Sequence, residues 1–301
     1  MAAAVAPVNF ETEIAYLKDP ERVVSDEVVG DASLREPHKK LVYDMRPTRD
    51  DFDLDVHGFQ ILDIPLKERN DKDMTEVTTK NFKEVEELLK AKLGVKHVYC
   101  FAPVLRPLDL ADKPVPNTQK TIPRPHLDFG PASAAEWWKW FTDPGLQQGV
   151  PAWLQSLGVD WKQPPRYSIL GLLQDMTDIN GSIRSFRLSL WRPLYKPVER
   201  DPLCVSDWKT VPDEDYVILQ PNKRKTYDGE WSVMKHSQRE GVDHRWWYMS
   251  AHRPDELLVF KHHDSKMDQV AWRCGHGAFP IAGTDHLPDR ESLEIRAFCI
   301  Y

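Results

Sequence analysis

The sequence predicts a mainly β fold with flanking helices: a sandwich, a barrel or a jelly roll. Two observations predict this class: 24 prolines among 301 residues, and many short apolar runs separated by turn residues. Strands are expected at 166–173, 185–191, 202–208, 215–220, 245–249, 256–262, 269–274 and 292–301. Because the composition shows no boundary, we interpret residues 1–301 as a single domain.

The first part of the chain, residues 1–94, mixes short strands with one helix, whereas 95–301 is richer in strands. The helix is expected at 81–94, because apolar residues recur there at every third or fourth position and Gly94 can end it. The other elements expected before residue 165 are strands at 40–46, 57–64 and 95–106 and helices at 133–141 and 149–159.

The charge balance and the hydropathy limit the partners of the protein. The net charge of −7 argues against a nucleic-acid surface. No window approaches the ~18 apolar residues that a membrane helix needs. The N-terminus lacks the basic region of a signal peptide. We therefore expect neither a nucleic-acid nor a membrane partner.

The four cysteines lie far apart in the sequence and include no Cys-x-x-Cys pair. This spacing excludes a cysteine zinc knuckle and is typical of reduced thiols. We therefore expect a cytoplasmic protein. The cysteines are Cys100, Cys204, Cys274 and Cys299.

The motif RPHLDF, at 124–129, places a histidine and a carboxylate two residues apart. On a strand, the side chains of His126 and Asp128 would point to the same face. They would form either a surface pair or two thirds of a metal site. Two histidines and one carboxylate can hold Fe(II) and leave three coordination positions open. A distant histidine would have to complete such a site.

Four histidines in the last part of the chain are candidates for that third ligand. His276 lies in AWRCGHGAF, a strand-like segment that ends at glycines, whereas His286 lies in the turn-rich AGTDHLPD. Because a metal ligand must be held rigidly, we prefer His276. His262 and His263, in FKHHDS, are better explained as the end of a strand than as a second metal site.

An arginine and a serine follow His276 in the segment RESLEIR. On a strand, four side chains of this segment would share one face: Arg290, Ser292, Glu294 and Arg296. A guanidinium group can bind a carboxylate bidentately, and a hydroxyl can add a hydrogen bond. The pair Arg290 and Ser292 therefore suits the far carboxylate of 2-oxoglutarate. Arg296 is a second candidate for this role, and its pairing with His286 is the weaker alternative.

The sequence resembles the fungal and bacterial hydroxylase/desaturase group of Fe(II)/2-oxoglutarate-dependent dioxygenases. This group includes cephamycin methoxylase-type proteins and fungal secondary-metabolite oxygenases. The matching stretches follow the order of the family over about 95–301: PHLDF (125–129), LWRPL (190–194), DPLCVSDW (201–208), WWYM (246–249), PDELLVFKHHDS (254–265), CGHGAF (274–279) and DRESLEIRAF (289–298). One departure is the second histidine of HHDS, where the family usually has an aromatic residue.

The resemblance implies a double-stranded β-helix, or jelly roll, as a catalytic core over 95–301, buttressed by 1–94. It assigns the iron to His126, Asp128 and His276, and it assigns the 2-oxoglutarate anchor to Arg290 with Ser292. It also implies O2 as a co-substrate. The expected reaction is hydroxylation, desaturation or oxidative ring closure at an unactivated C–H bond. The expected substrate is a small secondary metabolite or an amino-acid-derived compound.

Five residues are candidates for the substrate pocket. Phe129 and Phe279 flank the expected iron ligands in the sequence. Phe298 and Ile300 follow from strand alternation with Arg296. Arg192, in LWRPL, is either a structural ion-pair partner or a ligand contact, and the structural role is favoured.

Two other classes of function remain open at this stage. One is a metalloenzyme that uses the same triad without 2-oxoglutarate, for example a zinc hydrolase or a cofactor-independent iron dioxygenase. The other is a jelly roll that binds a ligand without catalysis. Arg290 and Ser292 argue against the first class, because neither chemistry needs a diacid. The intact set of metal ligands argues against the second.

Overall fold

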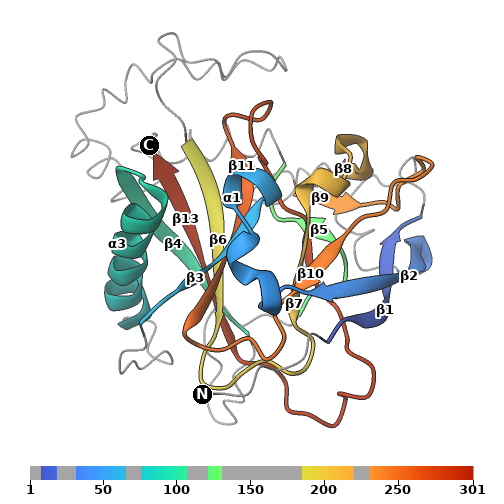
Figure 1. Ribbon diagram of the computed structural model, residues 1–301, viewed down its shortest axis with the longest axis horizontal. Coiled ribbons are helices and arrows are strands. Elements are labelled where there is room, and N and C mark those ends of the chain that lie inside the picture. The colour runs from blue at the N-terminus through green and yellow to red at the C-terminus, as the bar shows by residue number, and fades with distance from the viewer. Residues whose placement is uncertain are drawn as a thin grey trace, which may run out of the picture.

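The computed structural model describes residues 8–18, 32–65, 76–106, 121–130, 185–219 and 231–300. Within these ranges the chain is mainly β, with a few helices at the flanks (Figure 1). The strands form two sheets, one of eight strands and one of five. The prediction of a mainly β fold with flanking helices is confirmed.

The five-stranded sheet is antiparallel throughout and is built from distant parts of the chain. Its order is β3 (Phe59–Asp63), β11 (Glu256–Asp264), β6 (Ser185–Pro193), β13 (Ser292–Ile300) and β4 (His97–Arg106). Strand β11 carries a bulge at His262, because Lys261 pairs with Leu188 while His263 pairs with its neighbour Arg187. Such a bulge can re-aim one side chain toward a site.

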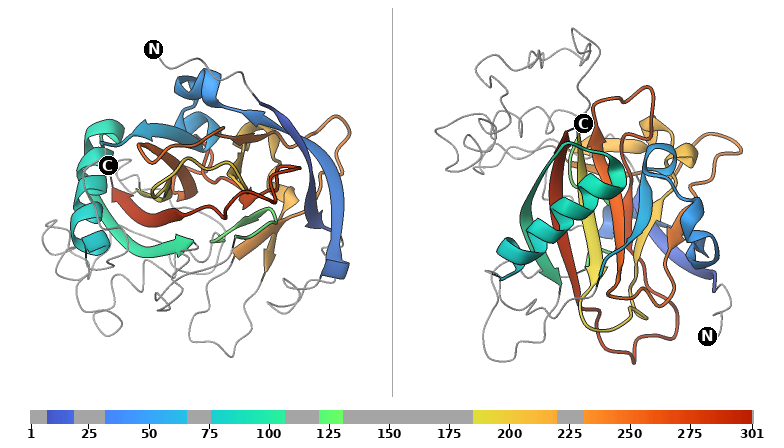
Figure 2. Two further views of the ribbon diagram at one scale, coloured as in Figure 1. Left: turned by 90° about the horizontal axis from the view of Figure 1, so that it is seen from below. Right: turned by 60° about the vertical axis from the view of Figure 1, so that its left-hand side comes forward.

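The eight-stranded sheet has several very short strands at its centre. Its order is β1 (Phe10–Leu17), β2 (Arg35–Asp44), β10 (Trp246–Tyr248), β7 (Leu203–Ser206), β12 (His276–Ala278), β5 (His126–Leu127), β9 (Trp231–Met234) and β8 (Tyr216–Leu219). Only the pairing of β10 with β2 is parallel among these described strands. The β1–β2 hairpin curves along the outside of the molecule (Figure 2, left).

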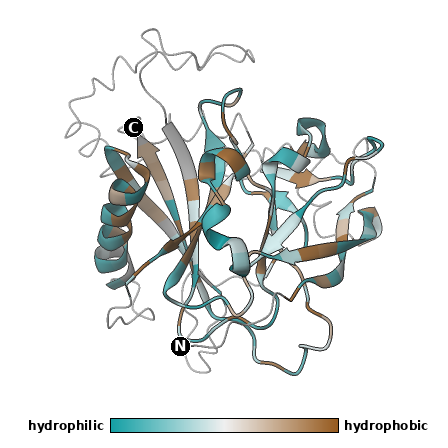
Figure 3. Ribbon diagram, viewed as in Figure 1, coloured by the Kyte–Doolittle hydropathy of each residue, from teal (hydrophilic) through white to brown (hydrophobic). Residues whose placement is uncertain are grey.

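Helix α3 (Phe82–Leu93) covers the outer face of the five-stranded sheet (Figure 2, right). Val85 and Leu89 point into the core that the helix forms with the sheet, and polar residues occupy other parts of its surface (Figure 3). Gly94 ends the helix with a φ of 68°, a left-handed conformation that glycine adopts at little cost. The predicted helix over 81–94 is confirmed.

The remaining helical elements are short. A π-helical turn (Val77–Asn81) precedes α3, and helix α1 is a single turn (Leu54–His57). Asp53 caps α1 by accepting a hydrogen bond from the backbone N–H of Asp55. The described 3-10 turns are Ala32–Leu34, Arg46–Asp51, Trp208–Thr210 and Asp213–Asp215. Within the described ranges, no helix has the length and apolarity required to cross a membrane.

The two faces of the five-stranded sheet have different chemistry. Leu190 and Ile295 are register partners, and both point into the core beneath α3. Their neighbours Trp191 and Glu294 are also register partners, and alternation directs them to the opposite, inner face. The inner face therefore carries the polar groups of β13, and the site is built there.

The strand expected at 269–274 does not form, so this prediction is wrong. The backbone N–H groups of Gln269 and Val270 close a turn onto the carbonyl of Lys266. The next residue, Ala271, is held by Asp55 and Lys261: its N–H donates to the Asp55 carbonyl, and its carbonyl accepts from Lys261 Nζ at 2.7 Å. Ala271, Trp272 and Cys274 are thus buried without pairing in a sheet.

Lys261 is fully buried, and its ammonium group has three acceptors. Besides the Ala271 carbonyl, Nζ donates to Asp55 Oδ1 and to Asp264 Oδ2, each at 2.7 Å. This cluster ties β11 and α1 to the segment that leads into β12. A buried ammonium with every donor satisfied avoids the cost of an unpaired charge.

The other strand predictions at 185–191, 202–208, 215–220, 245–249, 256–262 and 292–301 each find a strand, with shifted ends. Strands β1 and β9 were not expected. The elements expected at 133–141, 149–159 and 166–173 lie outside the described residues. The division at residue 94 stays a prediction, although β2 and β3 pair with strands from the second part of the chain.

Candidate active site

Two neighbouring short strands bring His126 and His276 together. The two residues are direct register partners in β5 and β12, and their ring centroids lie 4.4 Å apart. Asp128 follows β5, and its Oδ1 lies 3.4 Å from Nε2 of His126 and 3.9 Å from Nε2 of His276. Two ligand atoms bonded at about 2.1 Å to one ion lie at most about 4.2 Å apart. The three side chains could therefore hold one metal ion.

The ring orientation of both histidines suits metal binding. Nδ1 of His126 lies 2.8 Å from the carbonyl oxygen of Arg124, and Nδ1 of His276 lies 3.3 Å from that of Cys274. A carbonyl only accepts hydrogen bonds, so each Nδ1 carries the proton. Each Nε2 then presents a lone pair toward the centre, as in metal sites whose ligands are oriented by outer hydrogen bonds.

The protonation states also suit a metal site. Burial and the neighbouring His126 hold the pKa of His276 well below its usual value, so the imidazole is neutral at neutral pH. Burial alone would raise the pKa of Asp128. The Arg296 guanidinium and the adjacent imidazoles overcome this effect and hold the pKa of the Asp128 carboxyl well below its usual value. A neutral imidazole and an ionised carboxylate are the forms that bind metals.

Glycine is needed next to His276. A Cβ atom at Gly277 would lie 2.8 Å from the carbonyl oxygen of Arg124, the same oxygen that accepts from His126 Nδ1. Without a side chain at this position, β12 can approach β5 closely enough for the two imidazoles to face each other. The sequence CGHGAF thus has a local steric reason for its second glycine.

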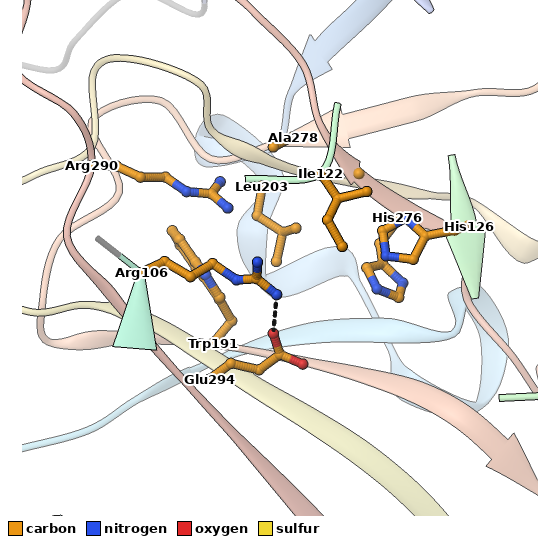
Figure 4. A pocket seen from close by; sticks show the side chains of 10 residues that line it. Arg106, Ile122, His126, Trp191, Leu203, His276, Ala278, Arg290 and Glu294 are labelled. Atoms are coloured by element: carbon orange, nitrogen blue, oxygen red, sulfur yellow. Dashed lines mark hydrogen bonds and ion pairs between the residues drawn. The ribbon is translucent and has the colours of Figure 1, made fainter. Parts of the chain in front are cut away.

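A pocket extends from the two histidines to two arginines (Figure 4). Arg106 and Arg290 lie at one end of the view, and His126 and His276 lie at the other. Glu294 Oε2 accepts a hydrogen bond from Arg106 Nη2 at 3.4 Å. The remaining lining residues are Ile122, Trp191, Leu203, Gly277 and Ala278.

Arg290 is buried at the arginine end. Its Nη1 donates to the carbonyl oxygen of Asp201 at 2.6 Å, and its guanidinium lies 5.2 Å from the centre of the Trp191 ring. Burial and the nearby Arg106 lower the pKa of Arg290 to about 10, which leaves it charged at neutral pH. Among the described residues, Arg290 Nε and Ser292 Oγ have no hydrogen-bond partner. A carboxylate would satisfy these donors.

Arg296 shares the inner face of β13 but has a different partner. Its Nη2 donates to Asp128 Oδ2 at 2.7 Å, and its guanidinium lies 5.2 Å from the centre of the Phe129 ring. It does not line the pocket that ends at Arg290. The alternative site, in which His286 would be the metal ligand paired with Arg296, is not supported, because His286 is exposed on a loop.

His262 reaches the site from the bulge in β11. Its Nε2 lies 2.6 Å from Ser189 Oγ and 3.9 Å from Asp128 Oδ2, and its ring packs edge-on against His276 at 5.5 Å. Ser189 Oγ donates to Glu294 Oε1 at 2.8 Å. Burial lowers the pKa of His262 to about 4. The sequence indicated only a strand end for this histidine, and its approach to Asp128 was not expected.

The substrate-pocket candidates are placed differently from one another. Phe129 lies beside His262, with 5.1 Å between ring centroids. Phe279 packs against Trp246 in a core beneath the β1–β2 hairpin, and it does not line the pocket.

Arg192, Phe298 and Ile300 belong to β6 and β13. Arg192 pairs with Leu293, whose side chain points toward α3. Its Nη1 donates to the Pro193 carbonyl, and it does not line the pocket. Phe298 is buried on the same face as Arg296. Ile300 pairs with Ser185 in the sheet, and its side chain lies outside what the structure describes.

The sequence did not single out Arg106, and it placed Glu294 on the shared face of the strand without giving it a role. Arg106 ends the expected strand at 95–106, and it enters the pocket because β4 and β13 pair with Arg106 opposite Ser292. Only the pairing of these strands shows this, and a sequence pattern does not report it. Glu294 alternates with Ser292 and Arg296, so its face was predictable, although its partner was not.

The comparison with known protein families finds a match over most of the chain. A family described as "Oxidoreductase/YMDC permease-like domain" matches residues 6–145 and 174–300. The chain belongs to this family. The match covers both halves of the site, from β5 to β13.

Curated relatives place this family among the Fe(II)/2-oxoglutarate-dependent dioxygenases. "Alpha-ketoglutarate-dependent dioxygenase phiK" of a fungal species is 29% identical over 86% of this chain and 83% of its own length. "Fe(II)/2-oxoglutarate-dependent dioxygenase nvfI" of Aspergillus novofumigatus is 28% identical over 86% and 82%. "Hydroxylase/desaturase efuI" of Hormonema carpetanum is 26% identical over 100% and 98%. The resemblance to the hydroxylase/desaturase group is thereby confirmed, and the chain is an oxidoreductase of that group.

A solved structure shows the same fold. The "iron and alpha-ketoglutarate-dependent endoperoxidase NvfI" superposes with a TM-score of 0.70 at 24% sequence identity, covering 97% of each chain. This likeness confirms the predicted jelly roll. It concerns the fold, and the roles of individual residues rest on the geometry of the site.

Proposed function

We propose that this dioxygenase uses Fe(II), 2-oxoglutarate and O2 to oxidise an unactivated C–H bond of a small secondary metabolite or an amino-acid-derived compound. The observation that carries the proposal is the arrangement of His126, Asp128 and His276, with both Nε2 atoms directed at one point near Oδ1. Two histidines and a carboxylate on one side of a metal leave the other positions open.

His126 and His276 would bind the metal through Nε2, and Asp128 would bind it through Oδ1. Bound Fe(II) together with 2-oxoglutarate supplies the O2-dependent oxidation that no protein side chain can perform. The protein itself fixes the ligands, since the carbonyls of Arg124 and Cys274 hold the two rings in place. These residues therefore determine where the reacting C–H bond must lie.

Arg290 and Ser292 would bind the far carboxylate of 2-oxoglutarate. Arg290 lines the pocket at the end opposite the two histidines, and Ser292 is the register partner of Arg106, which lines the same end. Both Arg290 and Ser292 are buried and carry donors that lack a partner among the described residues. Arg106 adds a second guanidinium at the same end (Figure 4). A dicarboxylate that reaches from the arginines to the metal would satisfy these groups without leaving a buried charge unpaired.

The walls of the pocket would exclude water from the reacting centre. Trp191 and Leu203 line it, and Phe260 packs on the ring of His276 with 4.7 Å between centroids. All three side chains are buried. A site with apolar walls strengthens the electrostatic contacts within it and protects reactive species from side reactions.

Phe129, Phe298 and Ile300 remain proposed substrate contacts, because Phe129 borders the metal ligands and Phe298 shares the inner face of β13. Arg192 and Phe279 are left out of the proposed pocket because of their positions. Hydroxylation, desaturation and oxidative ring closure all begin with removal of hydrogen from the same kind of bond. The proposal therefore covers the three outcomes.

The four cysteines support a reducing compartment. Cys100, Cys204, Cys274 and Cys299 are buried and free. Burial raises the pKa of each thiol, which makes the thiolate scarce. We propose a cytoplasmic location on this ground.

The test is an anaerobic titration of the purified protein with Fe(II) and 2-oxoglutarate, followed in the visible spectrum. We expect the charge-transfer band of 2-oxoglutarate chelated to Fe(II). The band should be absent in His276→Ala and should need more 2-oxoglutarate in Arg290→Gln. Iron that binds without any band would contradict the co-substrate and favour a metalloenzyme that does not use 2-oxoglutarate. Failure to bind iron would favour a jelly roll without catalysis.

A further inference from the structure

The two oxygens of Asp128 face different groups. Oδ1 lies near the Nε2 atoms of His126 and His276, at 3.4 Å and 3.9 Å. Oδ2 accepts from Arg296 Nη2 at 2.7 Å and lies 3.9 Å from Nε2 of His262. The carboxylate thus has one oxygen turned to the metal position and one turned to a cation.

A second set of side chains in the same region has the spacing of a metal site. Oxygen and nitrogen atoms of Asp128, His262 and Glu294 lie within 4.8 Å of one another. Both metal positions would share Asp128, so the ion could occupy one or the other. The two metal positions differ in the protein groups that already contact them.

The second position is filled by protein groups. Ser189 Oγ lies 2.6 Å from Nε2 of His262 and donates to Glu294 Oε1 at 2.8 Å. Arg296 Nη2 contacts the Asp128 oxygen on this side, and Arg296 Nε lies 3.9 Å from Glu294 Oε1. A metal ion there would face a guanidinium cation and would have to displace the serine.

We propose that Arg296 is a positioning residue for the metal ligand Asp128, distinct from the co-substrate anchor. By holding Oδ2, it presents Oδ1 alone to the ion and directs the ion to the position beside His126 and His276. This inference rests on the proposed function, since it assumes a metal at the triad. Arg296 is itself oriented by the Phe129 ring and by its place on β13, which pairs with β6 on one side and β4 on the other.

Removing Arg296 would have two opposing effects on metal binding. Loss of the cation would remove a repulsion and tighten binding. Loss of the hydrogen bond would free the carboxylate to rotate and weaken binding. Outer partners of metal ligands typically contribute ~10–100-fold to metal affinity. The proposal states that positioning outweighs repulsion, so the sign of the change is the decisive measurement.

The experiment compares Fe(II) affinity, by anaerobic competition with a chelator, in the wild type, Arg296→Met and Arg296→Lys. Methionine preserves the apolar bulk and removes both charge and donors, whereas lysine keeps the charge but lacks the guanidinium fork. We expect Fe(II) affinity to fall by ~10–100-fold in Arg296→Met and by less in Arg296→Lys. Affinity that is unchanged or tighter in Arg296→Met overturns the proposal.

A second measurement separates positioning from co-substrate binding. In protein saturated with Fe(II), 2-oxoglutarate should bind to Arg296→Met as it does to the wild type, and more weakly to Arg290→Gln. If Arg296→Met also weakens 2-oxoglutarate binding while it keeps its Fe(II) affinity, Arg296 is an anchor and the proposal is wrong. Thermal unfolding of the metal-free variants monitors folding. If Arg296→Met does not fold, Arg296→Leu replaces it, because leucine also removes the charge and the donors. An unchanged or tighter Fe(II) affinity in Arg296→Leu overturns positioning.

Failure of the proposed function has a different signature. In that case the wild type would not bind Fe(II), or His276→Ala would bind it as tightly as the wild type. Failure of the inference alone would leave tight Fe(II) binding in the wild type and its loss in His276→Ala. The two results cannot be confused.

Discussion

The two ends of the pocket differ in how completely their polar groups are satisfied. At the histidine end, each imidazole has a carbonyl partner at Nδ1, and Asp128 has Arg296. At the arginine end, Arg290 Nε and Ser292 Oγ have no partner among the described residues. The first end is oriented by the protein alone, whereas the second still offers buried donors to an anion. The comparison suggests a resident metal at one end and an exchangeable carboxylate at the other.

The largest expected effect comes from removing a metal ligand. His276→Ala should lower Fe(II) affinity by more than the ~100-fold upper range for outer partners, because one of three ligands is lost. Equilibrium dialysis under anaerobic conditions measures this. The matched control is His286→Ala, an exposed loop histidine ten residues further along the chain, which should bind Fe(II) as the wild type does. If both variants lose Fe(II) affinity equally, His276 is not a specific metal ligand and the assignment of the histidine end is wrong.

The next effect separates the two ends. Arg290→Gln removes a charge-assisted hydrogen bond worth about 1.5–3 kcal/mol, which corresponds to roughly 10- to 150-fold weaker binding of 2-oxoglutarate. Titration of the Fe(II)-loaded protein measures this. Fe(II) affinity should stay unchanged, because Arg290 lies at the far end of the pocket (Figure 4). A variant that loses iron and keeps 2-oxoglutarate would reverse the assignment of the ends.

A steric change tests whether the histidine end depends on close strand packing. In Gly277→Ala, the new Cβ would lie 2.8 Å from the Arg124 carbonyl oxygen, so β12 and β5 must separate. Overpacking of this kind costs typically 1–3 kcal/mol of stability. We expect a lower unfolding midpoint together with weaker Fe(II) binding. Unchanged Fe(II) affinity in a destabilised protein would show that the two histidines tolerate a wider strand spacing.

The smallest expected effect refines the arginine end. Ser292→Ala removes one neutral donor, and a hydrogen bond of this kind contributes about 0.5–1.5 kcal/mol. The affinity for 2-oxoglutarate should fall by roughly 2- to 12-fold, less than in Arg290→Gln. No change at all would indicate that the carboxylate rests on the two arginines alone.

Much of the site was predictable because its chemistry is concentrated in short motifs. His126 and Asp128 stand two residues apart, so their common location follows from the backbone. The position of His276 opposite His126 depends on strand register, which no local pattern reports. Arg106 was not predicted for the same reason, since its position in the pocket depends on the pairing of β4 with β13.

The errors in the fold prediction also have a physical cause. The apolar residues Ala271, Trp272 and Cys274 are buried, yet the backbone of this segment is held by Asp55 and Lys261 rather than by a neighbouring strand. Apolar patterns report burial, and burial does not require pairing in a sheet. Strand β9 is only four residues long (Trp231–Met234), too short for alternation to stand out.

The buried Lys261 cluster restricts how the sequence of this protein can evolve. Its ammonium joins α1, β11 and the segment that enters β12, so three distant stretches of the gene are tied to one side chain. Replacing Lys261 alone would leave the buried Asp264 carboxylate without its ammonium partner, typically at a cost of ~3–5 kcal/mol. Divergence here must therefore proceed by coupled substitutions. Residues of the cluster should vary together among descendants of this chain, even where the substrate pocket has changed freely.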